Sequence, residues 1–91
     1  MHDQKQWEKL FKGFANISRL KIIELLSSKK ELAVSDIARR IHVTFRGTSQ
    51  HLHILHGLGI LDREGRAGHV FYSLNKDMNA DADALINRFL E

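Results

Sequence analysis

The residues best suited to chemistry lie in the stretch "TFRGTSQHLHILHGLG", Thr44 to Gly59, which holds three histidines and one arginine among small polar residues. If this stretch is a helix, with about 100° between successive residues, Leu52 and Leu55 fall on one side, which is predicted to be buried. The side turned away from the leucines carries four polar residues, Arg46, Ser49, Gln50 and His53. Arg can bond guanine through two hydrogen bonds, Gln can bond adenine in the same way, and Ser is adaptable. The stretch therefore predicts a surface that contacts the edges of DNA bases.

The histidines also raise the question of a metal site. His51 borders the buried side and is predicted to be a half-buried packing residue. His53 and His56 are three residues apart and could share a metal, but this helix carries no Cys, Asp or Glu to complete a ligand set. No metal and no cofactor is therefore predicted. The alternative that stays open is a histidine-based metal sensor, which would use His53 with His56, or His2 and Asp3 with residues of a second subunit.

The elements that position this surface follow from the spacing of apolar residues and from capping residues. Two short helices joined by a short turn are typical of a helix-turn-helix, and a strand-turn-strand segment after them is typical of a winged helix. The predicted fold is therefore mainly α with a small β-hairpin wing. The expected elements are a helix over 3–14, a helix over 19–27 capped by Ser18, a minimal strand at 32–34, a helix from the cap Ser35 to Ile41, a helix over 44–58 capped by Thr44 and stopped by Gly59, two strands in 60–74 around the turn 65–68, and a helix over 77–90.

A second group of residues is predicted to contact phosphates or the minor groove rather than base edges. Arg39 and Arg40 lie on the first helix of the motif, where phosphate contacts are expected. Arg66 is expected at the tip of the wing, and an arginine on a projecting hairpin suits a phosphate or a narrow minor groove. The remaining members of this group are Thr44, Gly47, His56, Arg63 and His69.

The first and last helices carry more apolar surface than a domain of this size should need. Each has apolar residues at positions i, i+3, i+4 and i+7, the pattern of an amphipathic helix. We expect the two helices to form the seam of a homodimer, because a two-fold dimer matches the symmetry of an inverted-repeat operator. The predicted interface residues are Trp7, Leu10, Phe11, Phe14, Leu85, Ile86 and Phe89.

Composition narrows the choice of function. The 91 residues fit one domain, 1–91, and contain no cysteine, which excludes disulfides and thiolate metal sites. No apolar run approaches the roughly 18 residues of a membrane span, and the N-terminus is polar, so no membrane partner and a cytoplasmic location are expected. The net charge is +3, and no Asp or Glu occurs between Ile37 and Leu61, which favours an anionic partner at the middle of the chain. No nucleophile–base pair or carboxylate pair is found, so an enzyme is not expected.

Three segments of the chain resemble the ArsR/SmtB family of small winged-helix repressors: "LFKGFANISRLKIIELL", "ELAVSDIARRIHVTFRGTSQHLHILHGLGIL" and "DREGRAGHVFYSL". The most specific parts are "SQHLHILHGLGIL", which parallels the family pattern S-x-H-L-x-x-L-x-x-x-G-L-[VI], and the wing "REGRAGHVFYSL". The resemblance covers nearly all of residues 10–74. It implies a homodimer, held together by its first and last helices, that represses transcription by binding a palindromic operator.

The metal sites of the family are missing from this sequence. Its E-L-C-V-C-D motif appears here as "ELAVSD", so Ala33 and Ser35 stand where the two thiolates would be. The last-helix site lacks its histidine beside Asp81 and Asp83, and its later ligands are absent. The usual proline before the second helix is replaced within "NISR". The sequence therefore predicts a homodimeric, sequence-specific repressor without these metal sites. The open alternatives are the histidine-based metal sensor and a winged-helix protein-interaction module that does not bind DNA.

Overall fold

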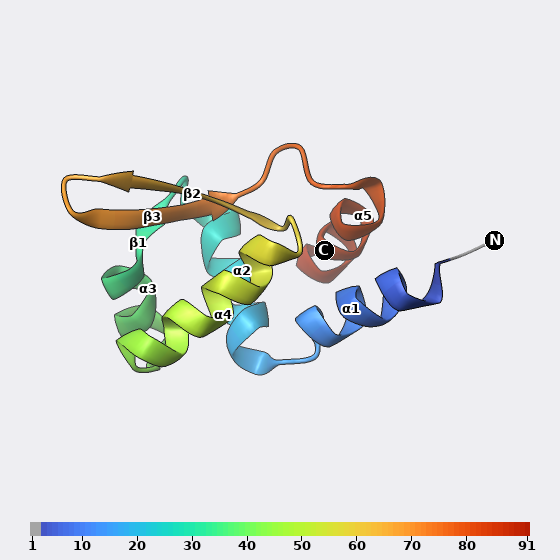
Figure 1. Ribbon diagram of the computed structural model, residues 1–91, viewed down its shortest axis with the longest axis horizontal. Helices are drawn as coiled ribbons and strands as arrows, with labels where there is room; N and C mark the ends of the chain where they lie inside the picture. The colour runs from blue at the N-terminus through green and yellow to red at the C-terminus, as the bar shows by residue number, and fades with distance from the viewer. Residues whose placement is uncertain (1–2) are drawn as a thin grey trace.

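A computed structural model describes residues 3–91 of the protein. Within these residues, a small antiparallel sheet lies along one edge of a group of helices, in the element order that the sequence predicts for a winged helix (Figure 1). The elements are α1 (Gln4–Phe14), α2 (Ile17–Ser28), β1 (Leu32–Ala33), α3 (Val34–Ile41), α4 (Phe45–Gly57), β2 (Leu61–Arg66), β3 (His69–Leu74) and α5 (Ala80–Leu90).

The sheet has the strand order β1-β3-β2, with both pairs antiparallel. The β2–β3 hairpin is the predicted wing, but its turn is shorter than the expected 65–68. Gly65 lies within β2 opposite Val70, and the turn consists of Ala67 and Gly68, with φ angles of 51° and 79°. Positive φ at both central residues matches the twist of the flanking strands, so pairing continues up to Arg66.

The core lies between the helix-turn-helix, α2 and the sheet. Its most deeply buried members come from α2, α3, α4 and the start of the wing, and are Ile22, Ile23, Ile37, Leu52, Leu55, Ile60 and Leu61. The end helices join the same core through Leu10 on α1 and through Ala82 and Ile86 on α5. Leu10 and Ile86, two residues predicted for the dimer seam, therefore lie inside the chain itself and support the end helices from within.

Two predicted helix starts are wrong, because α2 and α3 each begin before the position that the predicted serine cap requires. Helix α2 begins at Ile17, since the Asn16 side chain accepts a hydrogen bond from the Arg19 N–H at 3.2 Å, whereas Ser18 lies in the first turn. Asn and Ser are both good N-caps, so composition alone does not separate them. Helix α3 begins at Val34 rather than after Ser35, because Ala33 pairs with Phe71 in the sheet and the chain enters the helix directly from that strand.

The last helix also starts later than expected. The Asp77 N–H donates to Asn75 Oδ1 at 2.9 Å, which holds residues 75–77 in a turn. Asn79 then caps α5 by accepting from the Ala82 N–H at 2.8 Å. By contrast, α4 begins after the predicted cap Thr44, and Gly59, predicted to stop it, has a φ of 77°.

The described residues form an elongated body of 44 × 24 × 23 Å. The tip of the wing lies at one end of the long axis, α1 and α5 lie toward the other, and α4 crosses the middle (Figure 1). None of the helices in residues 3–91 combines the length and apolar character that crossing a membrane requires.

Candidate nucleic-acid interface

Helix α4 is held against the core by one side and leaves the other side free. Its N-terminus is fixed by Thr44, whose Oγ1 accepts a hydrogen bond from the Gly47 N–H at 3.0 Å. Thr48, Leu52 and Leu55 are buried, which confirms the side predicted to pack inward. The short turn before α4 depends on His42, whose left-handed backbone (φ 59°) ends α3 and turns the chain into the second helix of the motif.

The four predicted base-contacting residues lie together on the opposite side of α4. Arg46, Gln50 and His53 are exposed and Ser49 is half-buried. All four line one open groove of about 670 Å³, together with Ile54 and with Tyr72 from the neighbouring strand β3. Within residues 3–91, none of these four side chains has a hydrogen-bond or ion-pair partner, so their polar groups are available to a ligand.

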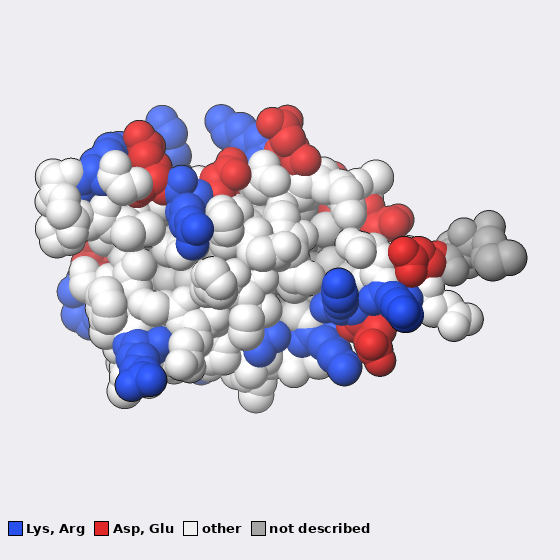
Figure 2. All heavy atoms as spheres, viewed as in Figure 1, with Lys and Arg blue, Asp and Glu red and all other residues white. Residues whose placement is uncertain are grey.

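The face of the molecule that carries α4 and the wing is uncharged at its centre. Figure 2, drawn from the same side as Figure 1, shows a mostly white surface over α4, with most Lys and Arg side chains toward its margins. This distribution suits a DNA duplex, because base edges are contacted by neutral and hydrogen-bonding groups while phosphates on either side are contacted by cations.

A model of the arsR family of bacterial regulatory proteins matches residues 17–63, which span the helix-turn-helix and the start of the wing. The chain belongs to the ArsR family. The family is one of bacterial regulatory proteins, and residues 3–91 have the winged helix-turn-helix fold seen in such regulators.

Relatives and solved structures agree with this assignment. The cadmium resistance transcriptional regulatory protein CadC homolog of Staphylococcus aureus is 36% identical over 69 residues, which make up 76% of this chain and 57% of that protein. The chain therefore spans less than two thirds of the length of this relative. The homodimeric winged helix-turn-helix DNA-binding domain Mb0332 of Mycobacterium bovis has a TM-score of 0.78 at 25% identity, over 93% of this chain and 75% of that one. The transcriptional repressor PagR of Bacillus anthracis has a TM-score of 0.73 at 28% identity, over 93% of both chains.

The structure of this ArsR-family chain gives a local reason for a glycine at position 47. A Cβ at this position would lie 3.0 Å from Val43 Cγ1 and 3.1 Å from Thr44 Oγ1, the atom that caps the helix. The missing side chain thus leaves room for the capping hydroxyl, in addition to the predicted role of letting phosphate approach the free N–H groups of the helix start.

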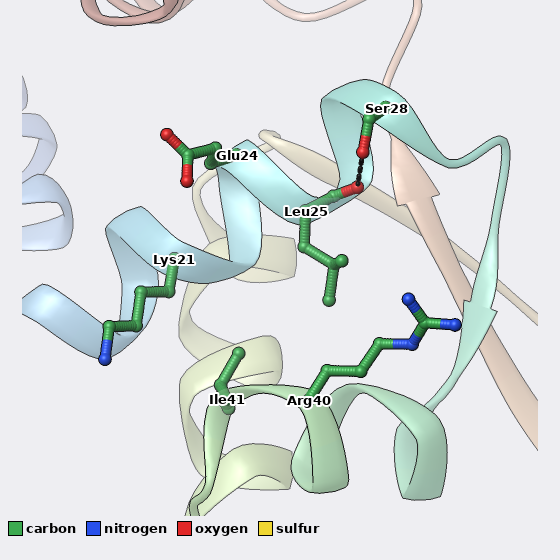
Figure 3. A pocket seen from close by; sticks show the side chains of 6 residues that line it. All are labelled: Lys21, Glu24, Leu25, Ser28, Arg40 and Ile41. Atoms are coloured by element: carbon green, nitrogen blue, oxygen red, sulfur yellow. Dashed lines mark hydrogen bonds between the residues drawn. The ribbon is translucent and has the colours of Figure 1, made fainter.

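The predicted phosphate contacts on α3 lie outside the α4 groove. Arg39 is paired with Asp36 on the same helix, at 2.8 Å, and both side chains are largely exposed. Arg40 lines a separate hollow of about 370 Å³ between α2 and α3. In Figure 3, Leu25 and Ile41 point toward one another across this hollow, and Arg40 extends along it. The side chains of Arg39 and Arg40 are therefore separate from the groove that the base-contacting residues of α4 line.

The three predicted wing residues have different surroundings. Arg66 is the last residue of β2 rather than a turn residue; it pairs with Glu31, and its guanidinium lies 4.2 Å from the centre of the Phe71 ring. The hydrogen bond that Arg66 donates to Glu31 raises the pKa of Arg66, which keeps the side chain charged. His69 lines a hollow between the wing and the start of α4. Arg63 is exposed on β2, directly opposite Tyr72.

The remaining histidines of α4 are placed as their helical positions suggest. His51 is half-buried, as predicted, and its Nδ1 accepts a hydrogen bond from Arg19 Nε at 3.2 Å. Burial, with the Arg19 charge as a smaller cause, lowers the pKa of His51 below its ordinary value, so this imidazole is held neutral. His56 is half-buried, at the border of the reading side.

The structure brings together no group of three or more potential metal ligands within residues 3–91. Of the residues named for a histidine-based metal site, His2 lies outside the described residues. Asp3 caps α1 by accepting hydrogen bonds from the Lys5 and Gln6 N–H groups, which gives it a structural role.

Three residues of this surface were not predicted from the sequence: Phe45, Ile54 and Tyr72. Ile54 follows Gln50 by one helical turn, so it could have been identified as an apolar residue outside the buried side of the helix. Phe45 could not, because it lies seven residues before Leu52 and therefore on the side that is predicted to be buried. Tyr72 could not, because only the pairing of the strands places β3 beside α4.

Proposed function

We propose that the chain acts as a homodimeric repressor that binds an inverted-repeat operator, with α4 of each subunit in the major groove. The observation that carries this proposal is the groove on α4, where four side chains suited to base contacts lie together and have no hydrogen-bond or ion-pair partner in the described part of the chain. Arg46, Ser49 and Gln50 lie in the first half of α4, the part of the second, recognition helix that enters the major groove in helix-turn-helix proteins, and His53 follows them.

The groups around the groove support the same geometry. Arg39 and Arg40 on α3, with Arg63 and Arg66 on the wing, would contact phosphates and so set the position of α4 on the duplex. Because these contacts displace counterions, binding should weaken steeply as salt rises. The repressor role is proposed from PagR, which is named a transcriptional repressor.

The dimer is proposed from the apolar surface of the end helices. Phe11 is 55% exposed and Phe89 is 42% exposed. The Trp7 and Phe11 rings contact each other with 5.5 Å between their centroids and an angle of 31° between their planes. Mb0332, whose fold is similar, is homodimeric. The half-buried residues Trp7, Phe14 and Leu85 complete the proposed seam.

The proposed regulator does not sense a soft metal at the position of the family's cysteine motif. Ala33 is buried at the β1–α3 junction, and its methyl group offers no ligand. Ser35 offers only a hydroxyl, which is a poor ligand for soft metals.

DNA binding is tested with a duplex selected from a random library by the wild-type protein. Arg46→Ala and Gln50→Ala should each weaken binding by about 1–3 kcal/mol for each lost base contact, and should relax the preference at one base pair of each half-site. Fluorescence anisotropy at several salt concentrations measures both effects. Arg88→Ala is the control, because Arg88 is an exposed arginine on α5, outside the groove. Wild-type affinity in both groove variants would place the DNA-binding surface elsewhere.

The dimer is tested separately by sedimentation equilibrium. Phe11→Ser should raise the dissociation constant of the dimer about 100-fold or more, since roughly 1.5–3 kcal/mol of burial is lost in each of two copies. A wild-type protein that stays monomeric at high concentration would contradict the dimer.

A further inference from the structure

The exposed apolar side chains of this protein fall into two groups. Among residues 3–91, six large apolar residues are exposed, and three of them, Phe11, Ile17 and Phe89, lie on α1, α2 and α5. The other three lie on the recognition helix and the wing: Phe45 (61% exposed), Ile54 (40%) and Val70 (42%). Of the first group, Phe11 and Phe89 belong to the proposed dimer seam, whereas Ile17 is the first residue of α2. The second group lies on the surface proposed to bind DNA, so the proposed dimer seam does not explain why these apolar side chains are exposed.

Ile54 and Phe45 border the base-contacting residues on α4. Ile54 lines the groove that also contains Arg46 and Gln50. Phe45 is the first residue of α4 and lines an adjoining hollow of about 250 Å³ with residues of the wing, including Val70. The N-terminal part of a recognition helix is the part that approaches base edges.

The chemistry of the major groove limits what these side chains can contact there. Every base presents hydrogen-bond donors or acceptors along the major-groove edge, cytosine also has a C5–H there, and thymine alone adds an apolar methyl group at C5. An exposed phenylalanine or isoleucine gains from covering that methyl group and gains nothing from a polar base edge. The uncharged centre of this face agrees with such contacts (Figure 2).

We infer that Phe45 and Ile54 contact thymine methyl groups, so that each half-site of the operator carries thymine at fixed positions. This inference rests on the proposed DNA-binding function. It extends that function by naming the base that the apolar side chains select.

The test removes the methyl group without changing any hydrogen bond. A duplex selected by the wild-type protein is resynthesised with deoxyuridine in place of thymidine, one symmetric pair of positions at a time. At the positions that Phe45 or Ile54 contacts, loss of one methyl should weaken binding about fourfold, and loss in both half-sites about 15-fold, as for burial of a methyl-sized group. The variants Phe45→Ala and Ile54→Ala should bind the thymidine duplex more weakly and should no longer distinguish it from the deoxyuridine duplex.

The controls separate this inference from the function on which it rests. Ile17→Ala removes an exposed apolar side chain on α2, and should leave the difference between the two duplexes unchanged. Tight binding of the wild-type protein to every deoxyuridine duplex would overturn the inference and leave the proposed function standing. A deoxyuridine effect that persists in both α4 variants would also overturn it, because another group would then contact the methyl. Failure to select any sequence at all would overturn both.

Discussion

Replacing Arg19 with methionine should measure how firmly the recognition helix is attached to the end helix α1. The Arg19 guanidinium donates to His51 Nδ1 on α4 at 3.2 Å, and to the carbonyl oxygens of Lys12 and Gly13 at the end of α1, at 3.1 and 3.4 Å. One half-buried side chain thus links α1, α2 and α4. Methionine keeps the aliphatic part of the side chain and removes only the donors and the charge.

The expected loss follows from these contacts. A typical hydrogen bond contributes about 0.5–1.5 kcal/mol net, and a cation near the last carbonyls of a helix adds roughly 0.3–1 kcal/mol. Because Arg19 is partly exposed and its contact with Gly13 is long, we expect Arg19→Met to lower the free energy of unfolding by about 2 kcal/mol. For a domain of this size, that corresponds to a fall in Tm of roughly 8–16 °C.

Two measurements check this prediction. Urea unfolding followed by circular dichroism gives the free energy, with Lys21→Met as the control, since Lys21 is an exposed cation on the same helix and its loss should change stability by less than about 0.5 kcal/mol. An NMR titration gives the pKa of His51, which should rise in Arg19→Met because the neighbouring charge is gone, and should stay below the ordinary value because burial remains. An Arg19→Met protein as stable as the wild type, with the pKa of His51 unchanged, would refute the proposed link.

Three further predictions concern the same helix and the wing. The pKa of His51 in the folded protein lies below its ordinary value, so as the pH falls below about 6.5 the unfolded chain binds more protons than the folded protein does. The free energy of unfolding therefore decreases below that pH. His51→Asn, which keeps an acceptor for Arg19, should reduce this decrease, as measured by urea titrations at pH 7.5 and 5.5. Thr48→Val should raise the free energy of unfolding by about 1 kcal/mol, because the buried Thr48 Oγ1 has no hydrogen-bond partner among residues 3–91. A less stable variant would show that the hydroxyl is satisfied. Arg66→Ala should weaken binding to operator and random DNA alike and lower the salt slope by about 1 in anisotropy titrations, whereas a loss confined to the operator would assign Arg66 to base contacts.

The sequence was sufficient to predict the helix-turn-helix and the side of α4 that faces solvent. The spacing of Leu52 and Leu55 and the cap at Thr44 are local features, and a helix that must bury one side has no other way to place Arg46 and Gln50. The acid-free region of the chain and the wing motif are local in the same sense. The motifs "SQHLHILHGLGIL" and "REGRAGHVFYSL" carried the resemblance to the ArsR family that the family comparison confirmed.

Long-range packing decided what local patterns left open. Leu10 and Phe11 are adjacent in one amphipathic helix, yet Leu10 is buried in the core of the chain and Phe11 is exposed. The contacts of α1 with the rest of the molecule determine which of the two side chains is covered. Arg66 looked free at a turn, but the pairing of the strands brings it beside Glu31, which lies 35 residues earlier in the chain. Tyr72 joins the groove for the same reason. Periodicity reports which side of a helix is apolar, whereas the neighbours that cover that side, or pair with a charge, are set by residues far away in the sequence.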